Sequence, residues 1–350
     1  MSLYPLMDVF IAFILEVIIG YPKWLPHPVK FINWFSKIVE AGYRKIADLL
    51  YSKKVKALGD DYVHMGIHRR RSEKISGIYF TILIVTVITL AVFGLVSVAY
   101  IIHPVAYHVV SIYFIYSAFG IKSVAIESID VCDALKDRDI FKAGNILAAN
   151  LGREIKNFDE QDIIRGSVEY AAERAMDKVI TPIFFAVVGS LFGLGAPLVY
   201  LYKTINTIKM NIGDKVEKAK GFGYASIKLN DLANYIPARI AGILLVVASL
   251  FLRKDFKGSF AIMRRDRRKN TNPNSGYLEA AVAGALGIKL GSSGLYFGDI
   301  TDKPSIGDNK RGAEIRDISD TINLMYTAAT IGIILFGIVY SLIFAAWYFM

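Results

Sequence analysis

The chain has 350 residues, of which 54% are hydrophobic, and it carries a formal net charge of +10. This composition is too apolar for an ordinary soluble protein, and its apolar residues form runs of about 20, the length of a helix that crosses a bilayer. Cys132 is the only cysteine, which excludes an intramolecular disulfide framework and a cysteine-based zinc site.

We therefore predict an all-α, polytopic helical membrane protein with about six spans, in which residues 1–350 form a single membrane-embedded domain. The predicted spans are residues 4–20, 76–101, 104–125, 180–202, 232–252 and 321–349.

Most Lys and Arg residues lie in the polar segments 20–75, 126–179, 203–231 and 253–320. Basic residues beside spans favour the cytoplasmic side, so the positive charge indicates membrane topology and not nucleic-acid binding. With the N-terminus outside, six spans place 20–75, 126–179 and 253–320 in the cytoplasm. The same count leaves the lysine-rich segment 203–231 outside, unless that segment folds back into a cavity.

Two predicted spans contain charged residues. Asp8, Ala12 and Glu16 follow one helical stripe, and a carboxylate in lipid costs several kcal/mol unless it faces protein or water. The stripe is therefore expected to face inward, either toward a polar cavity or toward a Lys or Arg of a neighbouring helix. Arg239 lies inside the apolar run of the fifth span, where it needs an anion, a water-filled cavity or a nearby interface.

The fourth predicted span contains Gly189, Gly193, Gly195 and Pro197. These residues either permit close helix packing or break the helix, so a broken or re-entrant element is expected there.

A row of carboxylates, Glu169, Glu173 and Asp177, follows the i, i+4, i+8 spacing of one helical face. Like charges at this spacing destabilise a helix, so a cation is expected to offset them. Mg²⁺ prefers oxygen ligands and bridges to substrate phosphates, which makes the row a predicted metal set. The alternative is a solvated helix face.

A turn of residues 272–276 leads into a helix with Glu279 in its first turn, directly after the basic run 264–269. Backbone amides at such a turn, together with nearby cations, favour an anion site, and the alternative for the basic run is a patch at the membrane surface. The chain contains no GxxxxGKS or GxxxxGKT loop, no GxGxxG after a strand and no HExxH pair. His27, between two prolines, is the histidine best placed for a role.

Four motifs carry a family resemblance: LPHPVKFI (25–32), LGRE (151–154) with the acidic row after it, NYIPARI (234–240) and NPNSGYLEAAVAGALGIKLG (272–291). In this order and spacing they resemble the adenosylcobinamide-phosphate synthase family of cobalamin biosynthesis, known as CbiB or CobD. The resemblance covers nearly the whole chain, and its last motif is the most specific.

The chain departs from the family pattern at several positions. Tyr21 stands where the family usually has Asp, Arg174 where it has Asn, and Asn230 where it has an acid. In the segment that follows Asn206, Lys209 replaces an acid and Asp214 replaces a Tyr. These departures point to altered metal binding, a different amine substrate or a paralogue with another role.

The resemblance implies an ATP-dependent ligase that joins adenosylcobyric acid, a corrinoid, to 1-amino-2-propanol or its O-phosphate, with ATP and Mg²⁺ as cofactors. It also implies a multi-pass protein of the cell membrane whose active site faces the cytoplasm, with a homo-oligomer left open. The expected catalytic residues are His27, Arg153, Arg239 and Glu279; those expected to bind substrate or phosphate are Asn206, Asp231, Asn274, Ser275 and Gly276. The alternatives are a non-catalytic membrane sensor of the same superfamily and a transporter.

Overall fold

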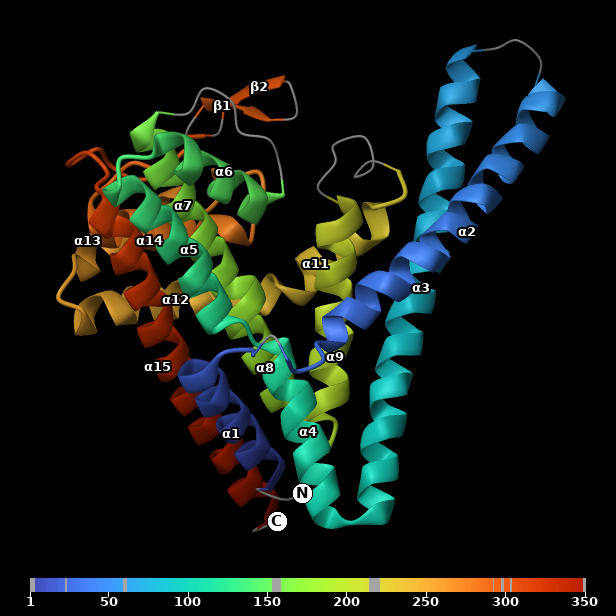
Figure 1. Cartoon of the computed structure of the whole chain (residues 1–350), viewed down its shortest axis with the longest axis horizontal. Helices are drawn as coiled ribbons and strands as arrows, with labels where there is room; N and C mark the ends of the chain where they lie inside the picture. Colours follow the sequence, from blue (N-terminus) through green and yellow to red (C-terminus); the bar gives the residue numbers. More distant parts are fainter. Residues whose placement is uncertain are drawn as a thin grey trace. The chain divides into compact units, whose positions relative to one another are not determined.

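The protein is described here by a computed structural model, shown in Figure 1. It describes residues 4–22, 24–58, 62–152, 159–213, 221–291, 293–296, 299–302 and 304–348. The chain divides into two compact units: unit 1 comprises residues 1–22, 119–187 and 234–350, and unit 2 comprises 23–118 and 188–233. The prediction of a single membrane-embedded domain stays a prediction.

Unit 1 is built mainly from helices. They are α1 (Tyr4–Ile19), α5 (Ile121–Lys136), α6 (Ile140–Leu151), α7 (Glu160–Ala175), the π-helix η1 (Met176–Ile180), the start of α8 (Thr181–Ser190), α12 (Tyr235–Phe251), α13 (Phe256–Asp266), α14 (Ser275–Leu286) and α15 (Ile315–Tyr348). The long helix α15 packs against α5, α7 and α12, while α13 packs against α14 (Figure 1). This packing brings the acidic row on α7 and the turn before α14 into one unit.

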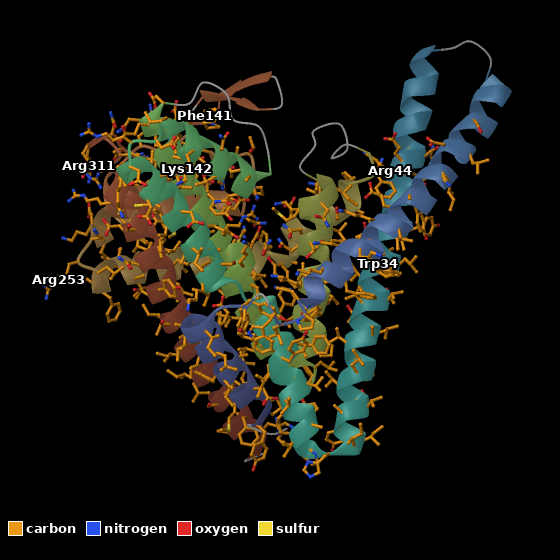
Figure 2. All side chains as sticks on the ribbon, viewed as in Figure 1. Trp34, Arg44, Phe141, Lys142, Arg253 and Arg311 are labelled. Atoms are coloured by element: carbon orange, nitrogen blue, oxygen red, sulfur yellow. The ribbon has the colours of Figure 1, made fainter. Side chains whose placement is uncertain are left out.

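Unit 2 contains α2 (Pro28–Leu58), α3 (Tyr62–Ile102), α4 (Pro104–Ala118), α9 (Gly195–Ile208), the π-helix η2 (Lys209–Gly213) and α11 (Tyr224–Ala233). Helices α2 and α3 form a long hairpin, and α3 also packs against α4 and α9. Arg44 of α2 pairs with Glu40 one turn earlier and lies 4.9 Å from the ring centroid of Phe222, whereas Trp34 on the same helix is exposed (Figure 2).

The fold is helical as predicted, with one exception. Strands β1 (Ser293–Tyr296) and β2 (Asp299–Asp302) pair in antiparallel fashion, with Ser293 opposite Asp302 and Tyr296 opposite Asp299. The all-α prediction missed this hairpin, whose two strands have only four residues each.

Fewer candidate spans than the predicted six are found among the described residues. Among the described residues, three helical stretches are long and apolar enough to cross a membrane: Arg71–Ile102, Pro104–Lys136 and Ile315–Trp347. The bent pair Tyr224–Ala233 and Tyr235–Phe251 adds a fourth if it is one span. The predicted first span has only the 16 residues of α1, and the predicted fourth is divided between α8 and α9.

The break between α8 and α9 confirms the interpretation of the glycine-rich fourth element. Gly193 has a φ of +71°, a conformation that disfavours any residue with a Cβ. A Cβ on Gly189 would lie 2.5 Å from the carbonyl oxygen of Leu194, so the chain turns back closely on itself at this point. Glycine is required there for the tight reversal.

The carboxylate stripe of α1 faces inward, as predicted. Asp8, Ala12 and Glu16 are all buried, and Glu16 Oε1 accepts a hydrogen bond of 3.0 Å from the backbone N–H of Lys122. The Lys122 ammonium group donates to the carbonyl of Ile18 at 2.6 Å, at the end of the same helix. The stripe therefore joins α1 to the start of α5.

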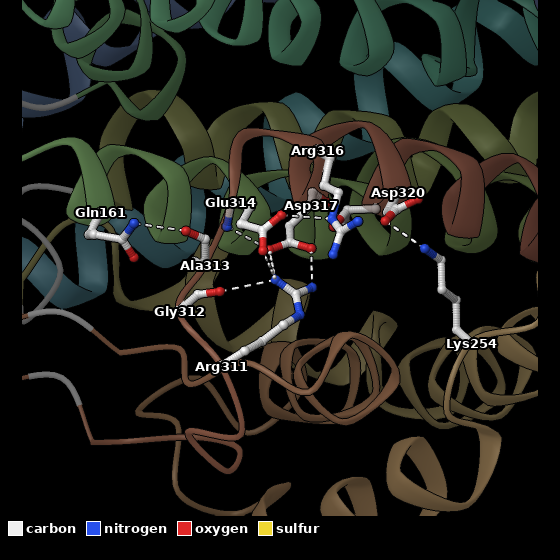
Figure 3. Close-up of polar contacts among 10 residues, drawn as sticks. Gln161, Lys254, Arg311, Gly312, Ala313, Glu314, Arg316, Asp317 and Asp320 are labelled. Carbon is white, nitrogen blue, oxygen red and sulfur yellow. Dashed lines mark hydrogen bonds and ion pairs between the residues drawn. The ribbon is translucent and has the colours of Figure 1, made fainter.

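A polar cluster fixes the start of α15 (Figure 3). The Arg311 guanidinium group donates to both carboxylate oxygens of Asp317, which also accepts the backbone N–H of Glu314 at 2.8 Å. Gln161 on α7 donates to the carbonyl of Ala313 at 2.8 Å. These contacts hold the segment that follows the β-hairpin against α7 and α15.

Candidate active site

The turn before α14 is held by asparagine side chains. Asn270 Oδ1 accepts the N–H of Asn272 at 2.8 Å, and Asn272 Oδ1 accepts the N–H of Asn274 at 3.0 Å. Asn270 Nδ2 donates to Glu279 Oε2 at 2.7 Å. Asparagine side chains that bond the backbone two residues on are typical of such turns. They place the buried Glu279 carboxylate against the turn.

Gly276 has a packing role that the sequence did not predict. A Cβ at this position would lie 2.3 Å from the carbonyl oxygen of Arg267, so the glycine permits the start of α14 to approach the end of α13. Its N–H donates to the carbonyl of Asn272 at 3.3 Å. Two of the amides predicted to cradle phosphate, those of Asn274 and Gly276, are therefore engaged within the turn. Ser275 is 1% exposed, and its Oγ has no hydrogen-bond partner among the described residues.

Part of the basic run before this turn is neutralised internally. The buried Asp266 carboxylate accepts from Arg265 at 2.8 Å, from the N–H of Gly307 at 2.9 Å and pairs with Lys269 at 2.8 Å. The hydrogen bonds from Arg265, followed by those from Lys269 and Gly307, hold the pKa of Asp266 well below its usual range despite its burial. Arg265 also pairs with Asp308 at 2.7 Å. Arg265 and Lys269 thus serve the fold.

Arg239 lies on α12 beside two aromatic rings. Its guanidinium carbon is 3.4 Å from the ring centroid of Tyr235 and 4.9 Å from that of Tyr277 on α14. Nη1 also donates to the carbonyl of Tyr235. The structure therefore brings the predicted Arg239 to the helix that carries Glu279.

The predicted metal set does not form a cluster. Glu169 and Glu173 lie on α7, but Asp177 belongs to the π-helix η1, whose wider turn changes the spacing on which the single-face prediction depended. Glu169 Oε1 accepts the N–H of Gly291 at 2.8 Å, and Asp177 Oδ1 accepts Asn234 Nδ2 at 3.0 Å. Across the described ranges, no three His, Cys, Asp or Glu side chains are placed to hold a metal ion. The Mg²⁺ set stays a prediction without supporting geometry.

A second polar cluster in unit 1 was not predicted. Glu127 on α5 accepts from the Tyr170 hydroxyl and from Lys178 Nζ at 3.0–3.1 Å. Arg174 lies over the Tyr170 ring, 5.2 Å from its centroid, and 3.9 Å from an oxygen of Asp177. Burial raises the pKa of Tyr170 and lowers that of Lys178, although Glu127 opposes the second shift. The signal in the sequence was Glu127, an acid that lies just after the predicted span 104–125.

Two residues predicted to bind substrate, Asn206 and Asp231, belong to unit 2. Asn206 on α9 is buried and donates from Nδ2 to Asn230 Oδ1 at 3.1 Å, beside the predicted Asp231 on α11. Arg153 lies outside the described residues.

His27 in unit 2 caps helix α2. Its Nδ1 accepts the N–H of Val29 at 3.3 Å, and Pro28 occupies the first helical position, which suits proline. Burial and then the ammonium groups of Lys203 and Lys30 lower the pKa of His27 from 6.5 to about 4. A neutral imidazole with this pKa is a weak base at pH 7, so the cap is the role that the geometry favours.

This cap predicts a pH dependence. Between pH 6.5 and about 4 the unfolded chain binds a proton at His27 that the folded chain does not, so stability falls as the pH falls through this range. We expect His27→Asn to keep the cap and to weaken the loss of thermal stability between pH 7 and 5. His27→Ala should cost about 1 kcal/mol at pH 7. Equal pH dependence in His27→Asn and the unchanged protein would contradict this assignment.

Comparison with known proteins agrees with the motif resemblance. Residues 9–325 match the model of the family described as CobD/Cbib protein. The cobalamin biosynthesis protein CobD of Clostridium perfringens is 38% identical over 330 residues, which cover 94% of this chain and 96% of the relative. The proteins of the same name from Geobacter metallireducens and Photorhabdus laumondii are 34% and 33% identical, over 96% and 94% of this chain and 96% and 95% of their own lengths.

The chain therefore belongs to the CobD/CbiB family, the adenosylcobinamide-phosphate synthase family of ligases in cobalamin biosynthesis. No solved structure matches the chain.

Proposed function

We propose that this protein forms an amide bond between adenosylcobyric acid and 1-amino-2-propanol or its O-phosphate, in an ATP-dependent reaction at the cytoplasmic face of the cell membrane. The observation that carries the proposal is the family match over residues 9–325, which includes every predicted site residue. The three helical stretches long and apolar enough to cross a membrane support a location in the bilayer.

The chemistry requires three tasks of the protein. A carboxylate does not condense with an amine at neutral pH, and ATP supplies the activation when it is bound. The protein must bind phosphate, hold the substrate carboxylate and take a proton from the amine. Guanidinium groups bind both phosphate and carboxylate in a two-pronged manner, which fits Arg239. Arg153 is assigned the same kind of role from the family motif alone.

Glu279 is the group that we assign to accept the amine proton. Its carboxylate is 3% exposed and is oriented by the 2.7 Å hydrogen bond from Asn270. Asn274 and Ser275, buried beside it at the start of α14, are assigned to shape the substrate site. Asn206 and Asp231 are assigned to substrate from the family motif, which departs from the usual pattern at Asn230.

The residues fit phosphate better than they fit a metal. Mg²⁺ is commonly bound by one or two carboxylates together with substrate phosphates, and the predicted Glu169, Glu173 and Asp177 do not converge on one point. We therefore derive no step through Mg²⁺. Whole-length membership of a ligase family favours the enzyme over the transporter and sensor alternatives.

The test measures ATP consumption by the purified protein in detergent. We expect consumption only when adenosylcobyric acid and an amine are both present, together with a product of the mass of the amide. Separate arms with free and phosphorylated 1-amino-2-propanol identify the amine. Glu279→Gln should lower turnover by about 10²- to 10⁴-fold without unfolding the protein, whereas Glu160→Gln at an exposed position should not. ATP consumption in the absence of the corrinoid would refute the proposal. So would a lack of ATP consumption when ATP, adenosylcobyric acid and an amine are all present.

A further inference from the structure

Two guanidinium groups meet at one aromatic ring in unit 1. Arg239 on α12 lies 4.9 Å from the ring centroid of Tyr277, and Arg267, which follows α13, lies 5.8 Å from the same centroid. Both distances are within the range of cation–π attraction. The Tyr277 ring on α14 thus lies within cation–π distance of guanidinium groups from two other parts of the chain.

These two arginines differ from their basic neighbours in their partners. Arg265 and Lys269 are paired with the buried Asp266. Within the part of the chain that the structure describes, Arg239 and Arg267 have no carboxylate partner: their hydrogen bonds go to the backbone carbonyls of Tyr235 and Arg264. Their positive charge is therefore not neutralised by the fold.

Both guanidinium groups have more donors than the fold uses. A guanidinium group carries five N–H donors, and each of these arginines donates one hydrogen bond to a backbone carbonyl. The buried Nε of Arg267 has no hydrogen-bond partner among the described residues. Two charged, pre-oriented donor sets of this kind suit the oxygens of a phosphate group.

The glycine at position 276 places Arg267 in this arrangement. Because Gly276 lacks a side chain, the start of α14 approaches the Arg267 backbone closely, with Tyr277 as the next residue. The close contact between α13 and α14 therefore holds both the Tyr277 ring and the Arg267 side chain in place. This pre-organisation reduces the entropy cost of binding.

We propose that Arg239 and Arg267, gathered on the Tyr277 ring, form a binding site for a phosphate group of a substrate, with Tyr277 as the residue that positions both. The proposal rests on the proposed function for the identity of the ligand, which is a phosphate either of the nucleotide or of the phosphorylated amine. The proposed site includes Arg267 and Tyr277. It does not include Arg265 and Lys269, which pair with Asp266.

The test is equilibrium binding to the full-length protein in detergent, without corrinoid. The probes are ADP, 1-amino-2-propanol O-phosphate and free 1-amino-2-propanol. We expect Arg267→Gln to weaken the binding of one phosphorylated probe by about 10- to 150-fold, since a charge-assisted contact is lost, and to leave the free amine unaffected. The probe that is affected identifies the source of the phosphate. Arg268→Gln, an exposed neighbour with the same charge change, is the matched control and should stay within twofold.

Further variants separate binding from folding. Arg267→Lys should recover part of the affinity because it keeps the charge and loses the two-pronged geometry. Tyr277→Phe should bind as the unchanged protein does, whereas Tyr277→Leu, which removes the π face, should weaken binding by about 2- to 5-fold. A loss of thermal stability in these variants with unchanged affinity would show that the arginines only hold the helices together, and would overturn the proposal.

Two further outcomes distinguish this inference from the proposed function. Equal effects of Arg267→Gln and Arg268→Gln, or no binding of either phosphorylated probe, would also overturn the site. If the protein makes the amide but Arg267→Gln leaves the affinity for both phosphorylated probes unchanged, this inference is refuted and the proposed function stands. Phosphate binding that requires Arg267, in a protein that makes no amide, would refute the proposed function and leave the phosphate site standing.

Discussion

Asp317→Ala should destabilise the detergent-extracted protein by about 3 kcal/mol. The carboxylate is fully buried and accepts hydrogen bonds from both Arg311 Nη atoms and from the N–H of Glu314 (Figure 3). Its removal leaves Arg311 with the Glu314 carboxylate at 3.7 Å as its ion-pair partner and leaves the Glu314 amide without its acceptor. Breaking a buried pair costs about 3–5 kcal/mol, and the lower end applies because the Arg311 side chain is 30% exposed. The measurement is the midpoint of thermal unfolding at one fixed heating rate, since membrane proteins often unfold irreversibly.

Asp320→Ala is the control for this change, one turn further along the same helix. Asp320 pairs with Lys254 at 2.6 Å, but the Asp320 side chain is 21% exposed, whereas that of Asp317 is fully buried. Pairs of this kind contribute about 0.2–1 kcal/mol. Equal shifts of the midpoint in the two variants would show that the contacts of Asp317 do not anchor the start of α15.

The sequence predicted those features of the fold that depend on local pattern. Apolar runs identified α3 and α15, and the clustered glycines identified the break between α8 and α9. The sequence correctly predicted that the stripe of Asp8 and Glu16 is buried. Both reasons, the helical period and the cost of a carboxylate in lipid, depend only on the local sequence. The described residues contain fewer candidate spans than predicted because hydrophobicity alone does not separate a span from a short helix that is buried in protein.

The π-helix η1 explains why the metal prediction lacks support. The row of Glu169, Glu173 and Asp177 was interpreted with α-helical spacing, and nothing local in the sequence indicates where a helix widens. The hydrogen bonds of Glu169 to Gly291 and of Asp177 to Asn234 join residues 122 and 57 positions apart. Such pairings follow from tertiary packing, so the periodicity of the sequence does not predict them.

The turn before α14 is the part of the candidate site that the sequence described best. Its asparagines and glycine were correctly identified as a tight turn that enters a helix beside Glu279. The side chains of Asn270 and Asn272 accept the N–H groups of Asn272 and Asn274, so these two amides of the turn are already hydrogen-bonded. The sequence indicates which residue types form the turn, but only the structure shows which of its donors are satisfied.

The glycine of this turn allows helix propensity and close packing to be separated, because they predict opposite results for Gly276→Ala. Helix propensity alone favours alanine in the first turn of α14 by about 1 kcal/mol. The structure predicts the reverse: the new Cβ would lie 2.3 Å from a backbone carbonyl oxygen, which cannot move without displacing the end of α13. We expect a net destabilisation of about 1–3 kcal/mol and a weaker affinity for the phosphorylated probe, because Arg267 moves with its carbonyl.

Gly144→Ala supplies the matched control, since this glycine lies in helix α6 of the same unit and its added Cβ would meet only Ile163 Cδ1 at 3.7 Å. That distance is ordinary contact, so alanine should be neutral or stabilise the protein by up to about 1 kcal/mol. The decisive comparison is the sign of the two shifts in unfolding midpoint. Should the midpoint of Gly276→Ala rise like that of Gly144→Ala, the close approach to Arg267 would not constrain this position, and the packing interpretation would be wrong.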